Sequence, residues 1–327
     1  MKKINTFLIT TVITPLFLMA QIQQPLLSQA VSIDFISDTQ QPMMVEKIIL
    51  KPTHNIKATS LLFSEILKTK PQSLYMLGDV VSLGFNNRKW KKVDRFLDSC
   101  RKENTTVCGL LGNHDVMGRK KKGEQNFNKR FPANVRTGYV SVTDSVAIVL
   151  LNSNFNKLSA ADKKKENEWY QSTLNMLDTS NAIKAVIVTC HHAPYTNSKI
   201  VGSSSQVQQN FVTPYIKSKK ARLFITGHAH GFEHFKIMGK DFLVIGGGGG
   251  LHQPMDTSDK RLPDIAADYK PLFHYLSVQR VADELSVTSH FLKSDFATFG
   301  TGHSFITNLS SNEVTKLEQQ PADGSHY

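Results

Sequence analysis

Apolar and polar residues recur with two different periods along this chain, and the period changes from one segment to the next. Short apolar runs rich in β-branched residues predict buried strands at 31–36, 74–77, 107–111, 185–188 and 223–226. Between them, apolar residues at helical spacing predict helices at 56–67, 87–102, around 169–177 and near 211–219. The alternation of strands and helices predicts a layered α/β (α+β) fold.

Other segments have the pattern of antiparallel strands. Segments 139–142 and 146–151 flank Thr143-Asp144-Ser145, a sequence typical of a hairpin turn. Segments 233–245 and 273–291 alternate apolar and polar residues in short runs. Periodicity fades after residue 295, and residues 318–327 form a polar tail. We therefore expect one domain over 31–295 and a C-terminal extension over 296–327.

Residues 1–30 have a different character from the rest of the chain. Lys2 and Lys3 precede an apolar stretch over 4–20, which is too short for a spanning helix and typical of a secretory signal peptide. Cleavage is expected after Ala20 or after Ala30, and an uncleaved N-terminal anchor is the alternative. No other apolar run is long enough to span a membrane. We expect a secreted or periplasmic protein without a stable membrane anchor.

The formal net charge of +12 favours anionic partners or substrates. Much of the excess lies in Arg119-Lys120-Lys121-Lys122, which could reach toward a bound anion, and in Lys163-Lys164-Lys165, which begins an amphipathic helix. Neither a nucleic-acid-binding motif nor interleaved aromatic residues accompany these runs, so specific nucleic-acid binding is not expected.

Three cysteines are too few for a disulfide scaffold. Cys100 and Cys108 flank a short helix-to-strand connection, where they either pair or remain buried thiols. Cys190 ends an apolar strand, and we expect a small core residue there rather than a nucleophile.

Five short clusters join carboxylate, amide or imidazole groups to a small turn residue, and four of them directly follow an apolar run. In chain order they are Ser37-Asp38-Thr39-Gln40, Gly78-Asp79, Gly112-Asn113-His114-Asp115, Cys190-His191-His192 and Gly227-His228-Ala229-His230. Ligands of α/β sheets bind at the carboxyl ends of strands, and two hard cations need mixed oxygen and nitrogen ligands. Single residues of these types are usually turn formers or core residues, but the ordered set predicts a hydrolytic dimetal centre.

Two details of spacing favour a pair of cations. Gly78 lets the backbone turn sharply before Asp79, whose two oxygens could bridge cations about 3.5–4 Å apart. His228 and His230 would share a face on a strand, whereas on a turn after Gly227 they can point to different metals.

In this order the clusters resemble the pattern of the calcineurin-like metallophosphoesterases, which is Asp-x-His, Gly-Asp, Gly-Asn-His-Asp/Glu, His and Gly-His-x-His. The resemblance covers residues 31–293 and includes the glycine run after the last cluster. It implies a two-sheet β-sandwich flanked by helices, with the dimetal site at the strand ends.

The resemblance also implies a role for each matching residue. The first metal would be held by Asp38, Gln40, Asp79 and His230, and the second by Asp79, Asn113, His191 and His228. His114 would contact the scissile phosphate or the leaving group, and Asp115 would hydrogen-bond His114 and fix its tautomer. The implied reaction is attack on phosphorus by a metal-bound hydroxide, with two Mn, Fe or Zn ions as cofactors.

Two positions depart from the family pattern. Gln40 stands where most members have His, and a neutral carboxamide is expected to bind metal less tightly or to favour a harder cation such as Mn²⁺. Relatives similar to manganese-dependent ADP-ribose/CDP-alcohol phosphatases also carry Gln there. Ser82 stands where purple acid phosphatases have Tyr, which argues against a tyrosinate-iron centre.

Some roles stay open at this point. His192 is an alternative to His191 as the ligand, or a group that supports it. The glycines at 246–250 either bind a phosphate or let the chain pass close to the metal loops, and His252 could approach the site. The long polar segment at 195–209 is a candidate substrate loop.

The function expected from these features is an exported metal-dependent phosphohydrolase acting on a phosphorylated small molecule or a nucleotide. A phosphomonoesterase and a nucleotide diphosphate or phosphodiester hydrolase remain alternatives, because Gln40 favours the second and export the first. A further alternative is a non-catalytic anion-binding protein on a degenerate phosphoesterase scaffold, which Gln40 and the basic runs motivate.

Overall fold

The computed structural model describes residues 31–310, which form one compact unit. The expected signal peptide at 1–30, with its two cleavage sites and its anchor alternative, lies outside the described residues, and so does the polar tail at 318–327. Among residues 31–310, no helix is both long and apolar enough to cross a membrane.

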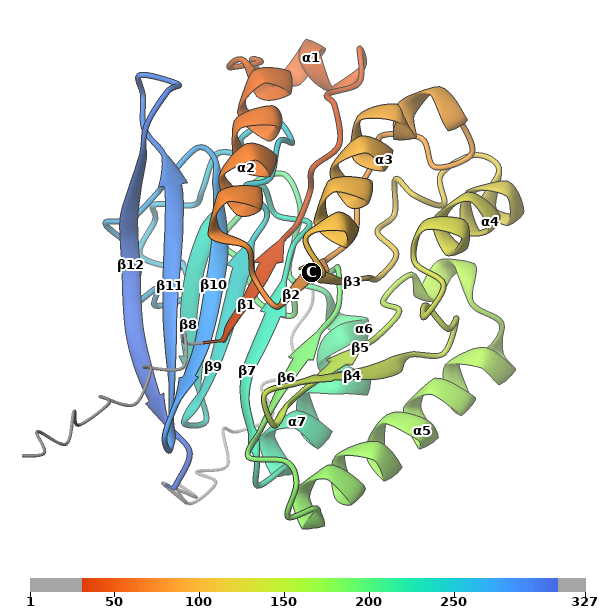
Figure 1. Cartoon of the computed structure of the whole chain (residues 1–327), viewed down its shortest axis with the longest axis vertical. Coiled ribbons are helices and arrows are strands. Elements are labelled where there is room, and N and C mark those ends of the chain that lie inside the picture. Colours follow the sequence, from red (N-terminus) through yellow and green to blue (C-terminus); the bar gives the residue numbers. More distant parts are fainter. Residues whose placement is uncertain (1–30, 311–327) are drawn as a thin grey trace, which may run out of the picture. The chain divides into compact units, whose positions relative to one another are not determined.

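Two six-stranded mixed sheets form the centre of this unit (Figure 1). The first sheet has the order β12-β11-β10-β1-β2-β3, with bounds Phe299–Asn308, Glu284–Leu292, His274–Val281, Ser32–Ile36, Ser73–Met76 and Thr106–Gly109. The second has the order β4-β5-β6-β7-β9-β8, with bounds Tyr139–Thr143, Val146–Leu150, Ala185–Thr189, Ala221–Thr226, Lys240–Ile245 and Phe232–Ile237. The predicted two-sheet architecture is confirmed.

Helices cover the outer face of each sheet. Those whose side chains pack on the first sheet are α2 (Asn55–Thr69), α3 (Asn87–Lys102) and α4 (Lys120–Arg130). Those on the second are α5 (Ala160–Thr179) and α7 (Thr213–Lys217). The short elements are α1 (Glu46–Ile49), α6 (Ser205–Val207), a 3₁₀ turn at Phe155–Lys157 and a π-helical turn at Gln208–Val212.

The apolar runs seen in the sequence arise because both faces of each sheet are buried. On β5, Val146, Ile148 and Leu150 pack in the core between the sheets. Ala147 and Val149 point the other way, into the core under α5 and α7. Side chains alternate across a strand, so a strand that is buried on both faces is apolar at every position.

Parallel pairing brings the carboxyl ends of strands together. In the first sheet β1, β2 and β3 are parallel neighbours. In the second, β5, β6, β7 and β9 are parallel in turn. The five clusters of candidate ligands follow β1, β2, β3, β6 and β7, so the topology collects them at strand ends of both sheets.

Two elements extend the fold beyond what the sequence predicted. β12 pairs with β11 from Leu292↔Phe299 to Glu284↔Asn308, so the sheet continues past the boundary expected at residue 295. β12 is an edge strand without a fully buried residue, which explains why its apolar periodicity is weak. α4 was not predicted as a helix, because Phe127 is the only large apolar side chain that it buries.

Candidate metal centre

Hydrogen bonds hold the candidate ligand loops side by side. The backbone N–H of Asp38 donates to Gly78 O at 3.1 Å, which joins the loops after β1 and β2. The N–H of Gly227 donates to His191 O at 3.0 Å, which joins the loops after β6 and β7. The N–H of His228 donates to Asp38 Oδ2 at 2.9 Å and so connects the two sheets. The clusters therefore converge through their own backbone.

The convergence is close enough to require glycine and to strain the backbone. A Cβ on Gly112 would lie 2.2 Å from Asp79 Oδ1, and one on Gly227 would lie 2.4 Å from Asp38 Oδ2. Asp38, Asp79 and His228 adopt positive φ angles of 59°, 47° and 69°. Such angles cost about 1 kcal/mol or more for each residue with a Cβ, and they concentrate at functional sites.

Asp38, Gln40 and His230 form a first group of ligands. The carbonyl oxygens of Asp38 and Asp79 can only accept hydrogen bonds, so the Gln40 amide nitrogen must face them, at 3.0 and 2.9 Å. This orientation leaves Gln40 Oε1 at 3.2 Å from His230 Nε2. Asp38 Oδ1 lies 3.4 Å from the same nitrogen. Two oxygens and one imidazole nitrogen thus point at one place.

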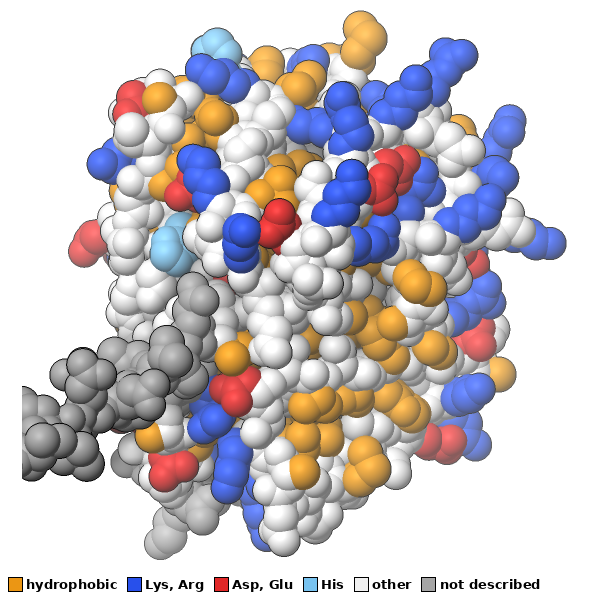
Figure 2. Space-filling view, in the orientation of Figure 1, with side chains coloured by type: hydrophobic (Ala, Val, Ile, Leu, Met, Phe, Trp, Pro, Cys, Tyr) orange, Lys and Arg blue, Asp and Glu red, His pale blue; other side chains and the backbone are white. Residues whose placement is uncertain are grey.

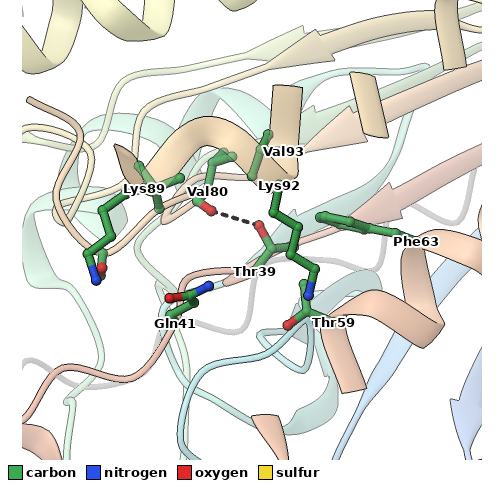
Figure 3. A pocket seen from close by; sticks show the side chains of 10 residues that line it. Thr39, Gln41, Thr59, Phe63, Val80, Lys89, Lys92 and Val93 are labelled. Atoms are coloured by element: carbon green, nitrogen blue, oxygen red, sulfur yellow. Dashed lines mark hydrogen bonds between the residues drawn. The ribbon is translucent and has the colours of Figure 1, made fainter. Parts of the chain in front are cut away.

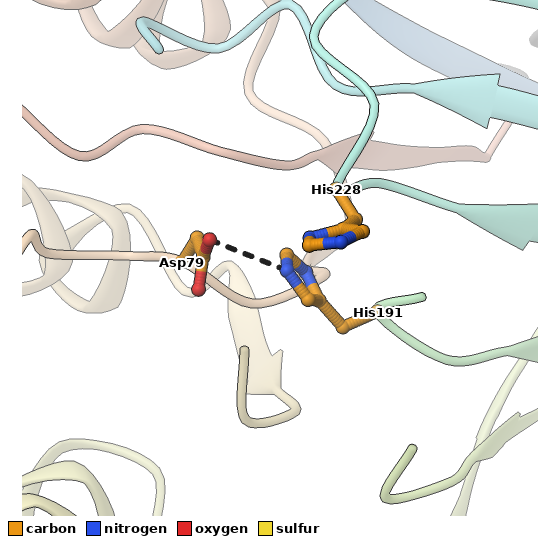
Figure 4. A group of neighbouring side chains, drawn as sticks. All are labelled: Asp79, His191 and His228. Atoms are coloured by element: carbon orange, nitrogen blue, oxygen red, sulfur yellow. Dashed lines mark ion pairs between the residues drawn. The ribbon is translucent and has the colours of Figure 1, made fainter. Parts of the chain in front are cut away.

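A second group contains Asp79, Asn113, His191 and His228. His191 Nε2 lies 3.3 Å from Asp79 Oδ2 and 3.1 Å from Asn113 Oδ1. Ligand atoms of Asp79, His191 and His228 all lie within 4.8 Å of one another, and Figure 4 shows the three side chains turned toward a common point. The structure therefore brings together all seven residues that the resemblance implied as ligands, with the Asp79 carboxylate beside the second group.

The structure separates the roles of His191 and His192. His191 Nδ1 donates to Leu77 O at 2.9 Å, which directs Nε2 toward Asp79 and Asn113. His192 instead pairs through Nδ1 with Ser153 Oγ at 2.8 Å, and its ring lies 4.5 Å from the ring of His228. His191 has the geometry of a ligand, and His192 supports its neighbour.

The charge balance of the two groups fits a cation. Asp38 Oδ1 accepts no hydrogen bond from any described residue although it is buried. His230 Nδ1 donates to Leu251 O at 2.7 Å, so the Nε2 lone pair faces two oxygens. Without a cation, the lone pairs of Asp38 Oδ1, Gln40 Oε1 and His230 Nε2 face one another unless the ring is protonated. A bound metal would accept all three lone pairs.

The pKa values show the same competition between protons and metal. Burial opposes the charged form of His191, but the Asp79 carboxylate raises its pKa to about 9. Burial also opposes charge on Asp79, and the field of His191 outweighs it and holds the pKa of Asp79 below its ordinary value. Burial, then His191 and His192, lower the pKa of His228, so its imidazole is neutral as a ligand must be.

His114 lies beside the second group rather than in it. Its Nε2 is 3.8 Å from Asp79 Oδ2, and its Nδ1 lies 3.3 Å from the carbonyl of Ser82. Because a carbonyl only accepts, Nδ1 carries the proton and Nε2 faces the centre. His114 is thus placed to touch a group bound next to Asp79.

The predicted hydrogen bond between Asp115 and His114 is absent from the described structure, and that prediction was wrong. The Asp115 carboxylate instead accepts from the backbone N–H groups of Gly112 at 2.9 Å, Val81 at 3.2 Å and Val80 at 3.4 Å. Two of these donors lie in the loop after β2 and the third in the loop after β3, and a buried N–H needs an acceptor. Burial and then the charge of Asp79 raise the pKa of Asp115 to about 7. Its task is to tie two loops together.

Glu46, on α1, is a neighbour of the site that the sequence did not reveal. Its Oε1 lies 3.7 Å from His114 Nε2, and its Oε2 accepts from the N–H of Met43 at 2.5 Å. The available signal was weak, since Glu46 is the single acid in the segment from Gln41 to Lys57. It places a second carboxylate against the free nitrogen of His114.

The space behind the first group is nearly filled (Figure 3). A cavity of about 10 Å³ lies between Thr39, which donates to Val80 O at 3.0 Å, and α3. Lys92 crosses this space toward α2, donates to Ile56 O at 2.7 Å, and has a pKa lowered to about 8 by burial and then by Arg95. Such a cavity holds about one water molecule, so substrate must reach the ligands from another side.

The glycines at 246–250 let the chain pass close to the metal loops. The N–H of Gly250 donates to Asp38 O at 2.9 Å, and a Cβ there would lie 2.4 Å from the His230 ring. His252 follows, half-buried, and its Nδ1 has no hydrogen-bond partner among the described residues. The loop at 195–209 is tied to this region, because Ser198 Oγ donates to Gln253 Oε1 at 2.6 Å.

The remaining candidates lie outside the two ligand groups. In the basic run, Arg119 stacks on Phe85 at 5.7 Å and Lys120 donates to the carbonyl of Lys157, while Lys121 and Lys122 are exposed. The three cysteines are buried free thiols. Cys190 Sγ donates to His192 O at 3.3 Å, and burial raises the pKa of that thiol.

Solved structures resemble this fold at low sequence identity. A purple acid phosphatase from yellow lupin (Lupinus luteus) seeds has a TM-score of 0.63 at 13% identity, over 86% of this chain and 54% of that one. GAP50, the anchor in the inner membrane complex of Plasmodium, has a TM-score of 0.64 at 13% identity, over 88% and 91%. A dimetal phosphatase from Danio rerio has a TM-score of 0.51 at 13% identity, over 83% and 98%. This chain thus spans about half the length of the lupin enzyme.

No curated protein matches the chain. The family described as "Calcineurin-like phosphoesterase" matches residues 31–232, a range that begins at β1 and ends just after His230. The match therefore contains all five clusters and both ligand groups. On this evidence the chain belongs to the calcineurin-like phosphoesterase family.

Proposed function

We propose that this chain is an exported phosphohydrolase that requires two metal ions and cleaves phosphate esters. The observation that supports it best is the pair of ligand groups that adjoin at Asp79, with the Nε2 of His114 at 3.8 Å from the Asp79 carboxylate. Ligands alone would fit a structural metal. A histidine that faces the ligands without joining them is what a hydrolase needs in addition.

The ligand residues and His114 would have different roles in this reaction. Asp38, Gln40 and His230 would hold one cation, and Asn113, His191 and His228 the other, with Asp79 shared. Bound cations lower the pKa of water and neutralise charge on phosphoryl oxygens. His114, with its proton on Nδ1 held by Ser82 O, orients Nε2 toward the substrate. When Nε2 is protonated, it can donate that proton to the leaving-group oxygen.

The test is hydrolysis of a substrate panel by metal-loaded protein. Aryl and alkyl phosphomonoesters, a phosphodiester and a nucleoside diphosphate derivative would be compared after loading with Mn²⁺, Zn²⁺ or Fe. We expect activity that tracks bound metal and is lost with a chelator. A protein that binds two equivalents of metal and cleaves none of these bonds would contradict the proposal.

The panel also distinguishes between the substrate classes. Gln40 supports a nucleotide or other phosphoanhydride, because a carboxamide is a weaker donor than an imidazole and neutralises less of the cation's charge toward a polyanionic substrate. Export, proposed from Lys2, Lys3 and the apolar stretch at 4–20, supports a phosphomonoesterase that acts outside the cytoplasm. Cell fractionation and the N-terminus of the mature protein test export independently of activity.

A second candidate is a non-catalytic protein on the same scaffold. Gln40 supports it, since the first group lacks one imidazole, and GAP50 is a protein of similar fold that is described as an anchor. Metal analysis separates the two candidates. Less than one bound equivalent under every loading condition would favour the non-catalytic protein, and two equivalents would favour the hydrolase.

A further inference from the structure

The segment around α1 exposes large apolar side chains to solvent. Met44, Val45, Ile48 and Ile49 are 86%, 60%, 83% and 75% exposed, and none of the residues of α1 is buried. Ile56, in the first turn of α2, is 53% exposed. We call these five side chains the α1 apolar patch. Isolated exposed apolar residues are ordinary, whereas five within thirteen residues of chain mark an interaction surface.

Cations are interleaved with this patch. Lys47, Lys51 and Lys57 are exposed, and Lys47 and Lys57 line an open pocket of about 600 Å³ between α1 and the start of α2. The only acid from Gln41 to Lys57 is Glu46, which is mostly buried and turned toward His114. In Figure 2 apolar and basic side chains appear together at the upper end of the molecule, where Figure 1 places α1. The patch is therefore apolar and positively charged.

The patch lies at the rim of the metal centre. Gln41 follows the ligand Gln40 directly, and Glu46 Oε1 is 3.7 Å from His114 Nε2. Whatever surface covers the patch therefore lies close to His114 and to the first ligand group.

We propose that the α1 apolar patch docks this protein on an anionic lipid surface. Its apolar side chains would enter the boundary between headgroups and acyl chains, with Lys47, Lys51 and Lys57 at the level of the phosphates. Four of the five side chains project from the surface at and just before α1, and Ile56 lines the open pocket beside Lys47 and Lys57. A fluid lipid surface surrounds projecting side chains without a complementary shape, whereas a protein partner would have to supply a pocket for each of them.

A fluorescent reporter within the patch tests the docking on the full chain. Ile48→Cys carries an environment-sensitive nitrobenzoxadiazole label, and Met176→Cys, 60% exposed on α5, carries the same label as the control. The three native cysteines are buried, which restricts labelling to the introduced thiol. Vesicles of phosphatidylcholine alone are compared with vesicles that contain equal amounts of phosphatidylglycerol and phosphatidylcholine.

We expect the label at position 48, and not at 176, to brighten and shift to the blue on phosphatidylglycerol vesicles, with a response that salt weakens. Tethering through the apolar stretch at 4–20 would leave both labels in water. No response at 48, or an equal response at 176, overturns the proposal. A label at 48 already shielded without vesicles also overturns it, because the chain itself, or a second copy if the shielding depends on concentration, then covers the patch.

Vesicle sedimentation of unlabelled variants provides the matched comparison. Ile48→Asp with Ile49→Asp should lower partitioning onto phosphatidylglycerol vesicles by about tenfold or more, since both the apolar contact and the charge become unfavourable. Lys47→Glu with Lys51→Glu should lower it by about tenfold, whereas Lys164→Glu with Lys165→Glu on α5 should not. Equal losses for the two lysine pairs would show general electrostatic adsorption and refute a docking site. None of these residues belongs to the metal centre, so a failed docking test leaves the proposed hydrolase untouched.

Discussion

The two halves of the candidate metal centre, namely the first and second ligand groups, are held in place by different kinds of contact. In the first half, Gln40 is a candidate ligand and also ties two loops together, because its amide nitrogen donates to the carbonyls of Asp38 and Asp79. In the second half, the candidate ligand His191 is oriented by a group outside the ligand set, the carbonyl of Leu77. One half thus combines ligation and support in a single residue, and the other separates them.

The support of the second half reaches deep into the second sheet. Glu166 Oε1, on α5, accepts from the N–H of Asn152 at 2.6 Å. Asn154 Nδ2 in the same loop donates to Leu111 O at 2.8 Å, just before the loop that carries Asn113. Ser153 Oγ pairs with His192 Nδ1 at 2.8 Å. A change at Gln40 should therefore alter the stability of the fold and metal binding together. In the second half, a substitution can alter one of these two properties without the other.

Asp79 should be needed by both halves of the candidate centre, since both share it. Asp79→Ala should lower phosphatase activity by about 10³-fold or more, because a metal pair supplies several kcal/mol of transition-state stabilisation. Metal analysis should show that both equivalents bind poorly. Asp98→Ala, at an exposed position of α3, is the control. Full activity with Asp79→Ala would refute the dimetal centre.

His114 should affect turnover while leaving both halves intact. His114→Ala should lower kcat by about 10²–10⁴-fold, the usual contribution of a positioned proton donor, with bound metal nearly unchanged. The loss should be larger for an alkyl phosphate than for a nitrophenyl phosphate, because the poorer leaving group needs the proton more. Equal losses for both substrates would argue that His114 only binds the phosphate. His54→Ala, at an exposed position before α2, is the control.

Removing one ligand from each half measures the asymmetry directly. Gln40→Ala and Asn113→Ala should each weaken one of two binding steps in metal titration calorimetry by at least about 10–100-fold, since even groups that merely support ligands have effects of that size. The first half has one imidazole where the second has two, so with an imidazole-preferring metal such as Zn²⁺ the first half should be the weaker one. Gln40→Ala should therefore spare the tight step, and Asn113→Ala the weak step. Loss of the same step in both variants would contradict two separate halves.

The double role of Gln40 predicts opposite effects of one substitution. Gln40→Glu places a carboxylate oxygen against the carbonyls of Asp38 and Asp79 in place of the donating nitrogen. The metal-free protein should lose about 1–3 kcal/mol of unfolding free energy, because a buried carboxylate oxygen would face two carbonyl oxygens with no donor between them. The added charge should strengthen Mn²⁺ binding. Urea unfolding with and without Mn²⁺ measures both effects, and Gln41→Glu, at the next position, is the control. A loss of stability in the presence as well as in the absence of Mn²⁺ would show that Gln40 only supports the loops.

The candidate ligands were easier to predict from the sequence than the groups that position them. Asp38, Asp79, Asn113, His191, His228 and His230 stand where apolar runs end, and chemical type together with chain order identified them. Asp115 was assigned to His114 because the two are adjacent, yet its carboxylate points to backbone donors of another loop. Orientation depends on where neighbouring loops put their N–H and C=O groups, and no pattern within one segment contains that information.

In the fold, too, elements with a strong local pattern were predictable, and elements that depend on contacts distant in sequence were not. Strands buried on both faces are continuous apolar runs, so β1, β2 and β5 to β7 were evident. β12 alternates half-buried and exposed residues at a sheet edge, and α4 buries one large apolar side chain, so neither has a strong local signal. Both are stabilised by neighbours distant in sequence.

Glu166 offers the smallest and most selective change, because it acts on the second half alone. Burial raises the pKa of Glu166 to about 8, whereas its ordinary value in an unfolded chain is 4.5. Between these values the folded state keeps a proton that the unfolded state releases, so the carboxyl destabilises the fold increasingly as pH rises. Glu166→Gln keeps an acceptor for the Asn152 N–H and cannot ionise. Its unfolding free energy relative to the native chain should therefore increase by about 3–4 kcal/mol from pH 5 to pH 8. Urea unfolding at the two pH values measures this, with Glu168→Gln, an exposed neighbour on α5, as the control.

Because Glu166 supports the loop beside His192 and Asn113, any change in metal binding should be confined to the step that Asn113→Ala also weakens. An effect on the step weakened by Gln40→Ala would mean that the two halves share their support after all.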